Sequence, residues 1–265
     1  MTDIQIMGVL NITDNSFYDG GKYNDPNKSI KRAKILINEG VDIIDIGAES
    51  SKPGSESISC DIQIRKIEPV VDAIRGISDV SISIDTRSSY VISRLIKYNI
   101  NIVNDISSLE DRDLLSLVKE NDLIVSLMHM KGTPKDMQDN PTYANLVEEI
   151  YSYLAGKIKL CTDIGITKNK IIIDPGFGFG KTLDHNYIIL NNLGYFKNLD
   201  CKLLAGISRK SMIGNVIDKP ASDRLYGSLA ATMLAIRNEV NILRVHDVKE
   251  TKMLLNFKDL ITKKS

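Results

Sequence analysis

The feature that most constrains the fold is a regular alternation between short apolar runs and helical patterns along all 265 residues. The apolar, β-rich runs cover residues 4–10, 42–46, 80–84, 101–104, 123–127, 170–173, 202–207 and 241–245. The helical patterns cover residues 29–39, 61–75, 88–97, 112–119, 142–163, 183–193, 223–237 and 248–260. Near-continuous apolar strands that alternate with helices predict a parallel sheet buried on both faces.

The chain length matches one parallel barrel of typical size. We therefore predict an α/β fold, a single TIM (β/α)8 barrel domain over residues 1–265, with the active site at the C-terminal ends of the strands. A doubly wound open sheet is the structural alternative, because local patterning does not prove that a sheet closes.

Polar and ionisable residues occur where each predicted strand ends. In chain order they include Asn11, Asp45, Asp85, Asn104, His129, Asp174, Lys210 and Arg244. Any one of them could be a helix cap or a satisfied buried polar group. The opposite ends of the strands, near Gly40, Gly76 and Gly165, have the composition of plain turns. This asymmetry predicts that the polar ends form one site.

The segment IIIDPGFGFGKT, residues 171–182, is the most distinctive of these strand ends. Glycines at alternating positions allow positive φ and a close approach of the backbone to a ligand, so Asp174 is expected to face the site, with Phe177 and Phe179 placed to cover a flat ligand. The alternative is a tight turn with Asp174 as a cap. The spacing fits neither a P-loop nor a dinucleotide fingerprint, which disfavours nucleotide binding through this loop.

The strand-end residues divide by charge. Arg244 and His246 alternate on one strand and are expected to form an anion clamp, with Asn11 and Ser51 facing the same region. That half suits a phosphate group, with or without a bound metal ion. Carboxylates and amides suit the donor-rich edge of a planar heterocycle, and an ammonium suits its carbonyl. Asp85, Asn104, Asp174 and Lys210 make up this second half, which therefore suits a pterin-like ring.

Composition mainly excludes classes of partner. Lys plus Arg and Asp plus Glu both number 34, and the chain has no Trp, so no basic or aromatic platform for nucleic acid stands out. No apolar run is long enough to span a membrane and the N-terminus does not resemble a signal peptide, which predicts a cytoplasmic protein. The three cysteines lie far apart in the sequence and are expected to be reduced and structural.

The ordered motifs closely resemble the dihydropteroate synthase family of folate biosynthesis. The resemblance is carried by MGVLNIT, SFYDGG, DIGAES, SIDT, NDIS, LMHMKGTP, DPGFGFGKT, AGISRKSMIG, RLYGSLAAT and LRVHDV, which span almost the full length. It implies condensation of 6-hydroxymethyl-7,8-dihydropterin diphosphate with 4-aminobenzoate, by departure of diphosphate with help from Mg²⁺ followed by attack of the arylamine. It also implies a homodimer, for which residues 228–237 are a candidate contact, although their apolar spacing equally suits packing on the barrel.

The resemblance assigns residues to each substrate group. Asn11 resembles the Mg²⁺ ligand, and Asn11, Ser51, Arg244 and His246 resemble the diphosphate site. The pterin contacts would be Asp85, Asn104, Ile106, Met128, Asp174, Phe179, Gly206, Lys210 and a stacking Arg209. The 4-aminobenzoate contacts would be Phe17, Ser51, Pro53, Lys210 and Ser211, and the catalytic set Asn11, Lys210, Arg244 and His246.

Two positions depart from the family pattern. The family usually has T-P-D-S-F and E-S-T-R-P-G in its first two loops, where this chain has Asn15 and Lys52 at the acid and arginine positions. A bidentate link between an acid and a guanidinium is therefore absent there, although Asp14 could make a weaker point contact with Lys52.

Two other functions stay open at this stage. One is a catalytically weak pterin-binding paralogue, which the Asn15 and Lys52 departures would favour. The other is a methyltetrahydrofolate corrinoid-protein methyltransferase, which would share the pterin half but has no need of the SRKS and RVHD segments.

Overall fold

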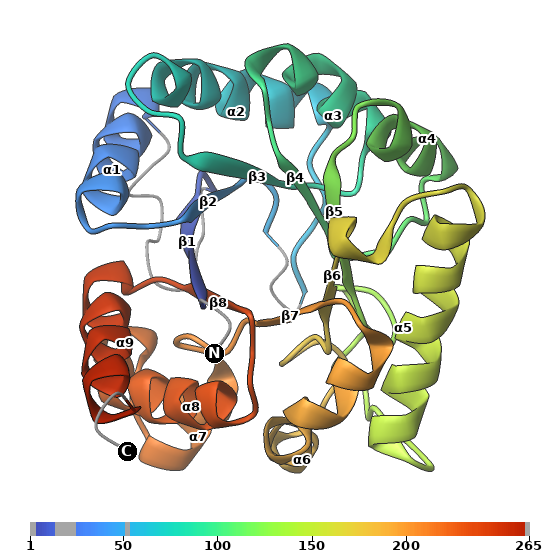
Figure 1. The fold of residues 1–265 in the computed structure, drawn as a ribbon, viewed down its shortest axis with the longest axis vertical. Helices are drawn as coiled ribbons and strands as arrows, with labels where there is room; N and C mark the ends of the chain where they lie inside the picture. The colour runs from blue at the N-terminus through green and yellow to red at the C-terminus, as the bar shows by residue number, and fades with distance from the viewer. Residues whose placement is uncertain (1–3, 14–24, 51–53, 263–265) are drawn as a thin grey trace.

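In the computed structural model the strands form a closed parallel barrel in the order β1 to β8, with helices around the outside (Figure 1). The structure describes residues 4–13, 25–50 and 54–262, the last five by their backbone only. The strands are β1 Gln5–Asn11, β2 Ile43–Gly47, β3 Ser81–Asp85, β4 Ile102–Asp105, β5 Ile124–Met128, β6 Ile171–Asp174, β7 Lys202–Ala205 and β8 Ile242–Val245. Closure is set by the pairing of β1 with β8, in which Met7 lies beside Arg244. The predicted TIM barrel is confirmed, and the open sheet is excluded.

The helices follow the strands around the outside of the barrel. They are α1 Pro26–Asn38, α2 Cys60–Arg75, α3 Ser89–Leu95, α4 Arg112–Glu120, α5 Leu146–Asp163, α6 Leu183–Asn191, α7 Ser211–Ile217, α8 Leu225–Arg237 and α9 Val248–Thr262. Ser88 caps α3 as expected, because its side chain accepts a hydrogen bond from the Val91 backbone N–H. Gly40 follows α1 with φ of +82°, a left-handed conformation that favours glycine.

Two helical predictions were wrong in detail. The helix expected from residue 142 begins at Leu146, because the Asn145 side chain caps it by accepting from the Glu148 N–H. The short α7 lies outside the helical ranges predicted from the sequence pattern. It occupies seven residues between β7 and α8, too few for a clear helical period.

The apolar core has two parts. A large cluster lies between the strands and the helices and includes Ile6, Ile44, Ile82, Val103 and Leu243. A small cluster consists of Met7, Ile43, Ile102, Ile172, Leu204 and Ile242, one residue from each of six strands. The two sets alternate along the strands, as expected when one face points into the barrel and the other toward the helices. The smaller cluster is therefore the packed floor of the barrel.

Candidate active site

The polar residues of the barrel mouth stand directly above this apolar floor. Side chains two positions apart on a strand share a face, so the residue two places after each floor residue points into the same interior. Those residues are Asp45, Asn104, Asp174, Gly206 and Arg244, with Val9 and then Asn11 above Met7. The strand period therefore brings together most of the positions predicted from strand ends.

Arg244 joins two carboxylates at the centre of this layer. Its Nε donates to Asp45 Oδ2 at 2.7 Å and its Nη2 donates to Asp85 Oδ2 at 3.0 Å. Asp45 also accepts from Ser83 Oγ at 2.6 Å and from Asn104 Nδ2 at 3.2 Å. Asp45 is completely buried; it was among the strand-end residues predicted to form the site, but no substrate contact was assigned to it. Its position two residues after Ile43 was the signal that could have found it.

The charged groups of this network shift one another's pKa values. Burial, followed by the Asp45 carboxylate, raises the pKa of Asp85 to about 7, while Arg244 acts in the other direction. The pKa of Arg244 is raised because the attraction of Asp45 and Asp85 outweighs the cost of burial. Arg244 is therefore a permanent cation held in place by two acids.

Asp174 and Lys210 are a second acid and base in this part of the site, and each affects the pKa of the other. Asp174 is 7% exposed, and its Oδ1 accepts from the Gly176 N–H at 2.7 Å. Lys210 Nζ donates to the Phe177 carbonyl and lies 4.7 Å from the centre of the Phe179 ring. Burial lowers the pKa of Lys210 to about 8, opposed by Asp174 and assisted by Arg244. At Gly206 a Cβ would lie 3.8 Å from both Asp174 Oδ2 and Lys210 Nζ, so glycine leaves this space open.

A cavity of about 370 Å³ opens above these charges. Its lining includes the predicted residues Asn11, Asp85, Phe179, Gly206, Arg209, Lys210, Ser211, Arg244 and His246. Asn104, Met128 and Asp174 are buried beneath it and do not line it. A concave site with convergent polar groups is the usual form of a small-molecule site.

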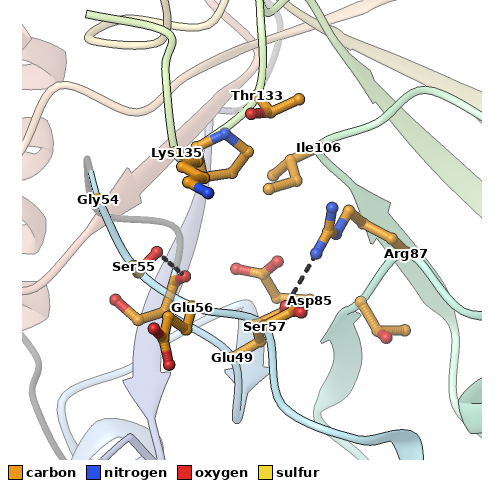
Figure 2. A pocket seen from close by; sticks show the side chains of 13 residues that line it. Glu49, Gly54, Ser55, Glu56, Ser57, Asp85, Arg87, Ile106, Thr133 and Lys135 are labelled. Carbon is orange, nitrogen blue, oxygen red and sulfur yellow. Dashed lines mark hydrogen bonds and ion pairs between the residues drawn. The ribbon is translucent and has the colours of Figure 1, made fainter.

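A second cavity, of about 520 Å³, lies beside the first and is shown in Figure 2. Glu49, Ser50 and Asp85 line both cavities, which therefore adjoin one another. Arg87 Nη2 donates to Glu49 Oε1 at 2.8 Å across this second cavity. Ile106, a predicted pterin contact, lines this cavity and not the first. The structure thus separates Ile106 from most of the other predicted ring contacts.

His246 is held by the neighbouring strand end. Ser208 Oγ accepts from the His246 backbone N–H at 3.2 Å and contacts its Nδ1 at 3.1 Å. Burial, followed by the charge of Arg244, lowers the pKa of His246 to about 3. His246 is therefore a neutral hydrogen-bonding group at physiological pH, and the positive charge of the predicted anion clamp lies on Arg244.

Arg209, predicted to stack over the pterin, lines the cavity and is held at the edges of its guanidinium. Its guanidinium is bidentate on Asp247, with distances of 2.7 and 2.8 Å, and its Nη1 donates to the carbonyls of Ala221 and Ser222 at 2.7 Å. Asp247 follows β8, so this buried pair ties the end of β7 to the end of β8. Arg209 also has φ of +58°, which is unusual for a residue with a side chain.

Phe177 was expected to cover a ligand, but its side chain is fully buried in the core. The site uses its backbone carbonyl, which holds Lys210. Six positions named from the sequence lie outside the described residues: Asp14, Asn15, Phe17, Ser51, Lys52 and Pro53.

Neither a membrane helix nor a complete metal cage occurs in the described part of the chain. Among those residues, no helix is both long and apolar enough to cross a bilayer. No cluster of three or more His, Cys, Asp or Glu side chains there could hold a metal ion.

Comparison with known proteins defines the class of enzyme. Residues 7–246 match the family described as pterin binding enzyme. The chain therefore belongs to the pterin-binding enzymes and, within them, to the dihydropteroate synthase family of folate biosynthesis, which makes it a transferase.

Individual relatives agree over nearly the whole chain. The dihydropteroate synthase of Escherichia coli strain K12 is 44% identical over 93% of this chain and 87% of its own length. The Yersinia pestis dihydropteroate synthase in a sulfonamide drug complex is 38% identical, with a TM-score of 0.95 over 99% of this chain and 95% of its own. The Xanthomonas albilineans enzyme with 4-aminobenzoic acid is 32% identical, with a TM-score of 0.89 over 97% and 93% of the two chains.

Proposed function

We propose that this protein condenses 6-hydroxymethyl-7,8-dihydropterin diphosphate with 4-aminobenzoate to give 7,8-dihydropteroate and diphosphate. The observation that carries the proposal is the placement of Asp174, Lys210 and Arg244 within one charged layer of the barrel mouth. This layer offers acceptors for a heterocycle and a cation for a leaving group. The structure of the X. albilineans relative with 4-aminobenzoic acid supports the choice of second substrate.

The pterin ring would be recognised by the buried acceptors. Asp174 and Asp85 accept from ring N–H and amino groups, Asn104 completes the edge, and Lys210 donates to the ring carbonyl. To do so, Lys210 must leave the Phe177 carbonyl and Arg244 must share Asp85 with the ring. Gly206 and Phe179 supply the flat surfaces, with Met128 beneath and Ile106 at the side.

The reaction would begin with loss of diphosphate. The bond between the exocyclic methylene carbon and the diphosphate oxygen breaks, and its electron pair leaves with the diphosphate. The carbon becomes cationic in conjugation with the ring, which makes the step SN1-like. Arg244 then faces the growing negative charge, and His246 donates a hydrogen bond from a neutral ring. The arylamine nitrogen of aminobenzoate supplies the pair for the new C–N bond and loses one proton.

The donor set also fits Mg²⁺. The Asn11 amide lines the same cavity as Arg244 and His246, and Mg²⁺ typically combines one or two protein oxygens with phosphate oxygens and water. When bound, Mg²⁺ would neutralise part of the diphosphate charge. Asn11 would orient the diphosphate through this ion, and Ser51 would add a hydroxyl, although Ser51 lies outside the described residues.

Aminobenzoate would bind at the outer part of the cavity. Ser211 is the first residue of α7 and lines the cavity beside Lys210, where both can meet a carboxylate. Phe17 and Pro53 would cover the aromatic ring. Replacing Lys52 with Arg would lower the aminobenzoate KM if the missing acid-guanidinium link limits this subsite. An unchanged KM would show that the departure has no effect.

The test is product formation from the two substrates, followed by mass spectrometry. We expect 7,8-dihydropteroate and diphosphate in equal amounts, with loss of turnover in Arg244→Met. Tight binding of both substrates without product would instead indicate the pterin-binding paralogue that Asn15 and Lys52 suggest.

We also propose a homodimer built on the α7 to α9 side of the barrel. Tyr226 and Leu234 of α8 are exposed there, at 82% and 40%, and Met253 and Phe257 of α9 are each 63% exposed. Sedimentation equilibrium would give a dimer mass for the wild type and a monomer for Phe257→Glu. A wild-type monomer at micromolar concentration would contradict the proposal.

A further inference from the structure

A buried lysine that the proposed reaction does not use lies behind the pterin half. Lys181 follows the glycine loop after β6, and its side chain is 3% exposed. Its Nζ lies 2.9 Å from the Phe179 carbonyl, 3.2 Å from the His129 carbonyl and 3.0 Å from His129 Nδ1. The three partners equal the number of N–H donors of an ammonium group.

The partners of Lys181 belong to a loop whose backbone is held throughout. Phe177 O accepts from Lys210 and Phe179 O accepts from Lys181, so the two lysines hold alternate carbonyls. Gln138 Nε2 donates to Gly178 O at 2.6 Å, and the Tyr143 hydroxyl donates to Gly180 O at 2.7 Å. The loop is therefore a rigid element that links β6 to the chain after β5.

The alternating glycines explain how this loop lies so close to its neighbour. Gly176 and Gly180 have φ of +75° and +64°. A Cβ at Gly176 would lie 1.9 Å from His129 O, and one at Gly180 would lie 2.4 Å from Lys131 O. Only glycine allows this contact. The contact brings His129 within reach of Lys181.

A positive charge on Lys181 would act on Asp174. Burial raises the pKa of Asp174, and Lys210, the Gly176 N–H, Lys181 and Arg244 each oppose that rise. Burial lowers the pKa of Lys181 well below its usual value, Asp174 opposes this and Lys210 adds to it. His129 is the titratable side chain that contacts Lys181 directly. Its pKa is lowered to about 3, first by burial and then by Lys181. His129 is therefore neutral and adds no competing charge.

Two arrangements of protons are compatible with the observed positions of Lys181 Nζ and its three partner atoms. If Lys181 is an ammonium, His129 accepts at Nδ1 and carries its proton on Nε2. If Lys181 is a neutral amine, it has only two hydrogens, and His129 must donate from Nδ1 to the amine. The ammonium form has one N–H for each of the three acceptor atoms, so it needs no donor from His129. Unlike the neutral amine, it also attracts the Asp174 carboxylate by its charge.

We propose that Lys181 is a buried cation and a positioning residue for the pterin-binding acid: it fixes the glycine loop and keeps Asp174 ionised from behind, while Lys210 acts from the substrate side. This rests on the proposed function only in taking Asp174 as a pterin contact. An ionised Asp174 carboxylate can accept hydrogen bonds from two ring N–H groups, whereas a protonated carboxyl would turn its own O–H donor toward a ring N–H donor.

The test is the pH dependence of binding of 6-hydroxymethylpterin, measured by calorimetry from pH 5 to pH 8. In Lys181→Met the Asp174 pKa should rise, so affinity relative to wild type should fall as the pH decreases. Between the Asp174 pKa of the variant and that of the wild type, the fall should be about tenfold for every pH unit. Taking the ratio to wild type cancels the titration of the ligand. A ratio that does not vary with pH would overturn the electrostatic part of the proposal.

Tyr143→Phe is the matched control. It removes the hydrogen bond to Gly180 O in the same loop without changing charge, so its affinity ratio should be independent of pH. If it shows the same pH dependence as Lys181→Met, loop disorder rather than charge is the cause, and the proposal fails.

A measurement on the wild-type protein covers the case in which Lys181→Met does not fold. ¹⁵N NMR should show His129 protonated at Nε2 and the Lys181 nitrogen as an ammonium at pH 7. Protonation at Nδ1 with a neutral lysine would contradict the proposal. Failure of wild type to bind the pterin would instead remove the proposed function and leave this spectroscopic result standing.

Discussion

Two buried cations tie neighbouring strand ends together, and they do so in different ways. On the β7–β8 side, Arg209 is bidentate on Asp247, and the partners are 5% and 11% exposed by side chain. On the β5–β6 side, Lys181 contacts two carbonyls and a neutral imidazole. The first cation is neutralised by its own partner, whereas the second has no carboxylate among its hydrogen-bond partners in the described part of the chain.

This difference separates a structural link from an electrostatic one. Asp247 neutralises Arg209, so breaking that pair should mainly affect stability and the placement of Lys210 and His246 on either side. The charge of Lys181 is available to Asp174. Changes on this side should therefore appear in ligand affinity and its pH dependence.

The largest effect is expected on the β7–β8 side. Arg209→Met leaves Asp247 buried without a partner and should reduce the free energy of unfolding by about 3–5 kcal/mol, measured by urea denaturation. Lys159→Met is the control, because it breaks an ion pair with Asp163 on an exposed helix face and should cost less than about 0.5 kcal/mol. Equal losses in the two variants would show that Arg209 contributes no more than a surface charge.

Asp174→Asn should give the next largest effect, on the other side of the comparison. One accepting oxygen becomes a donor that faces ring donors, which should weaken pterin binding by about 1–3 kcal/mol. Calorimetry with 6-hydroxymethylpterin measures this directly. Unchanged affinity would remove Asp174 from the binding site.

Deprotonation of Lys210 should reduce activity at alkaline pH. Its pKa is lowered to about 8, so its donating ammonium form is present below that pH and is lost as the pH rises through it. We expect kcat/KM for the pterin substrate to fall above about pH 8, because this parameter reports ionisations of the free enzyme. Lys210→Arg should be less active but should lack this fall. A wild-type profile that stays flat well above that pKa would contradict the assignment.

The smallest effect is expected for Tyr143→Phe. Loss of one neutral hydrogen bond should lower the free energy of unfolding by about 0.5–1.5 kcal/mol and leave the pH dependence of pterin affinity unchanged. Thermal unfolding provides the first quantity. A loss above about 3 kcal/mol would mean that the loop depends on this bond more than a single neutral hydrogen bond allows.

The fold could be predicted because the apolar runs themselves encode it. Each strand is short, apolar and followed by a helix, and the alternation of floor and outer residues fixes which strand-end side chains face inward. Asn104, Asp174 and Arg244 were found because each stands at the polar end of a predicted strand. Asp45 follows the same rule, but only its contacts with Arg244, Ser83 and Asn104 show that it is central.

The remaining features depend on partners far apart in the sequence. Nothing near Arg209 indicates that its guanidinium binds Asp247, 38 residues away. Lys181 lies 52 residues from His129, and a lysine after a glycine loop gives no local sign of burial. The pKa directions of Lys210 and His246 likewise follow from burial and from charges on other strands.

The most direct test of the central claim is the release of diphosphate from 6-hydroxymethyl-7,8-dihydropterin diphosphate, with and without 4-aminobenzoate, in Mg²⁺ and then in EDTA. We predict release that needs Mg²⁺, occurs slowly without aminobenzoate, and becomes coupled to dihydropteroate formation when aminobenzoate is added. Tight binding of the diphosphate substrate with no release under any of these conditions would contradict the proposed reaction.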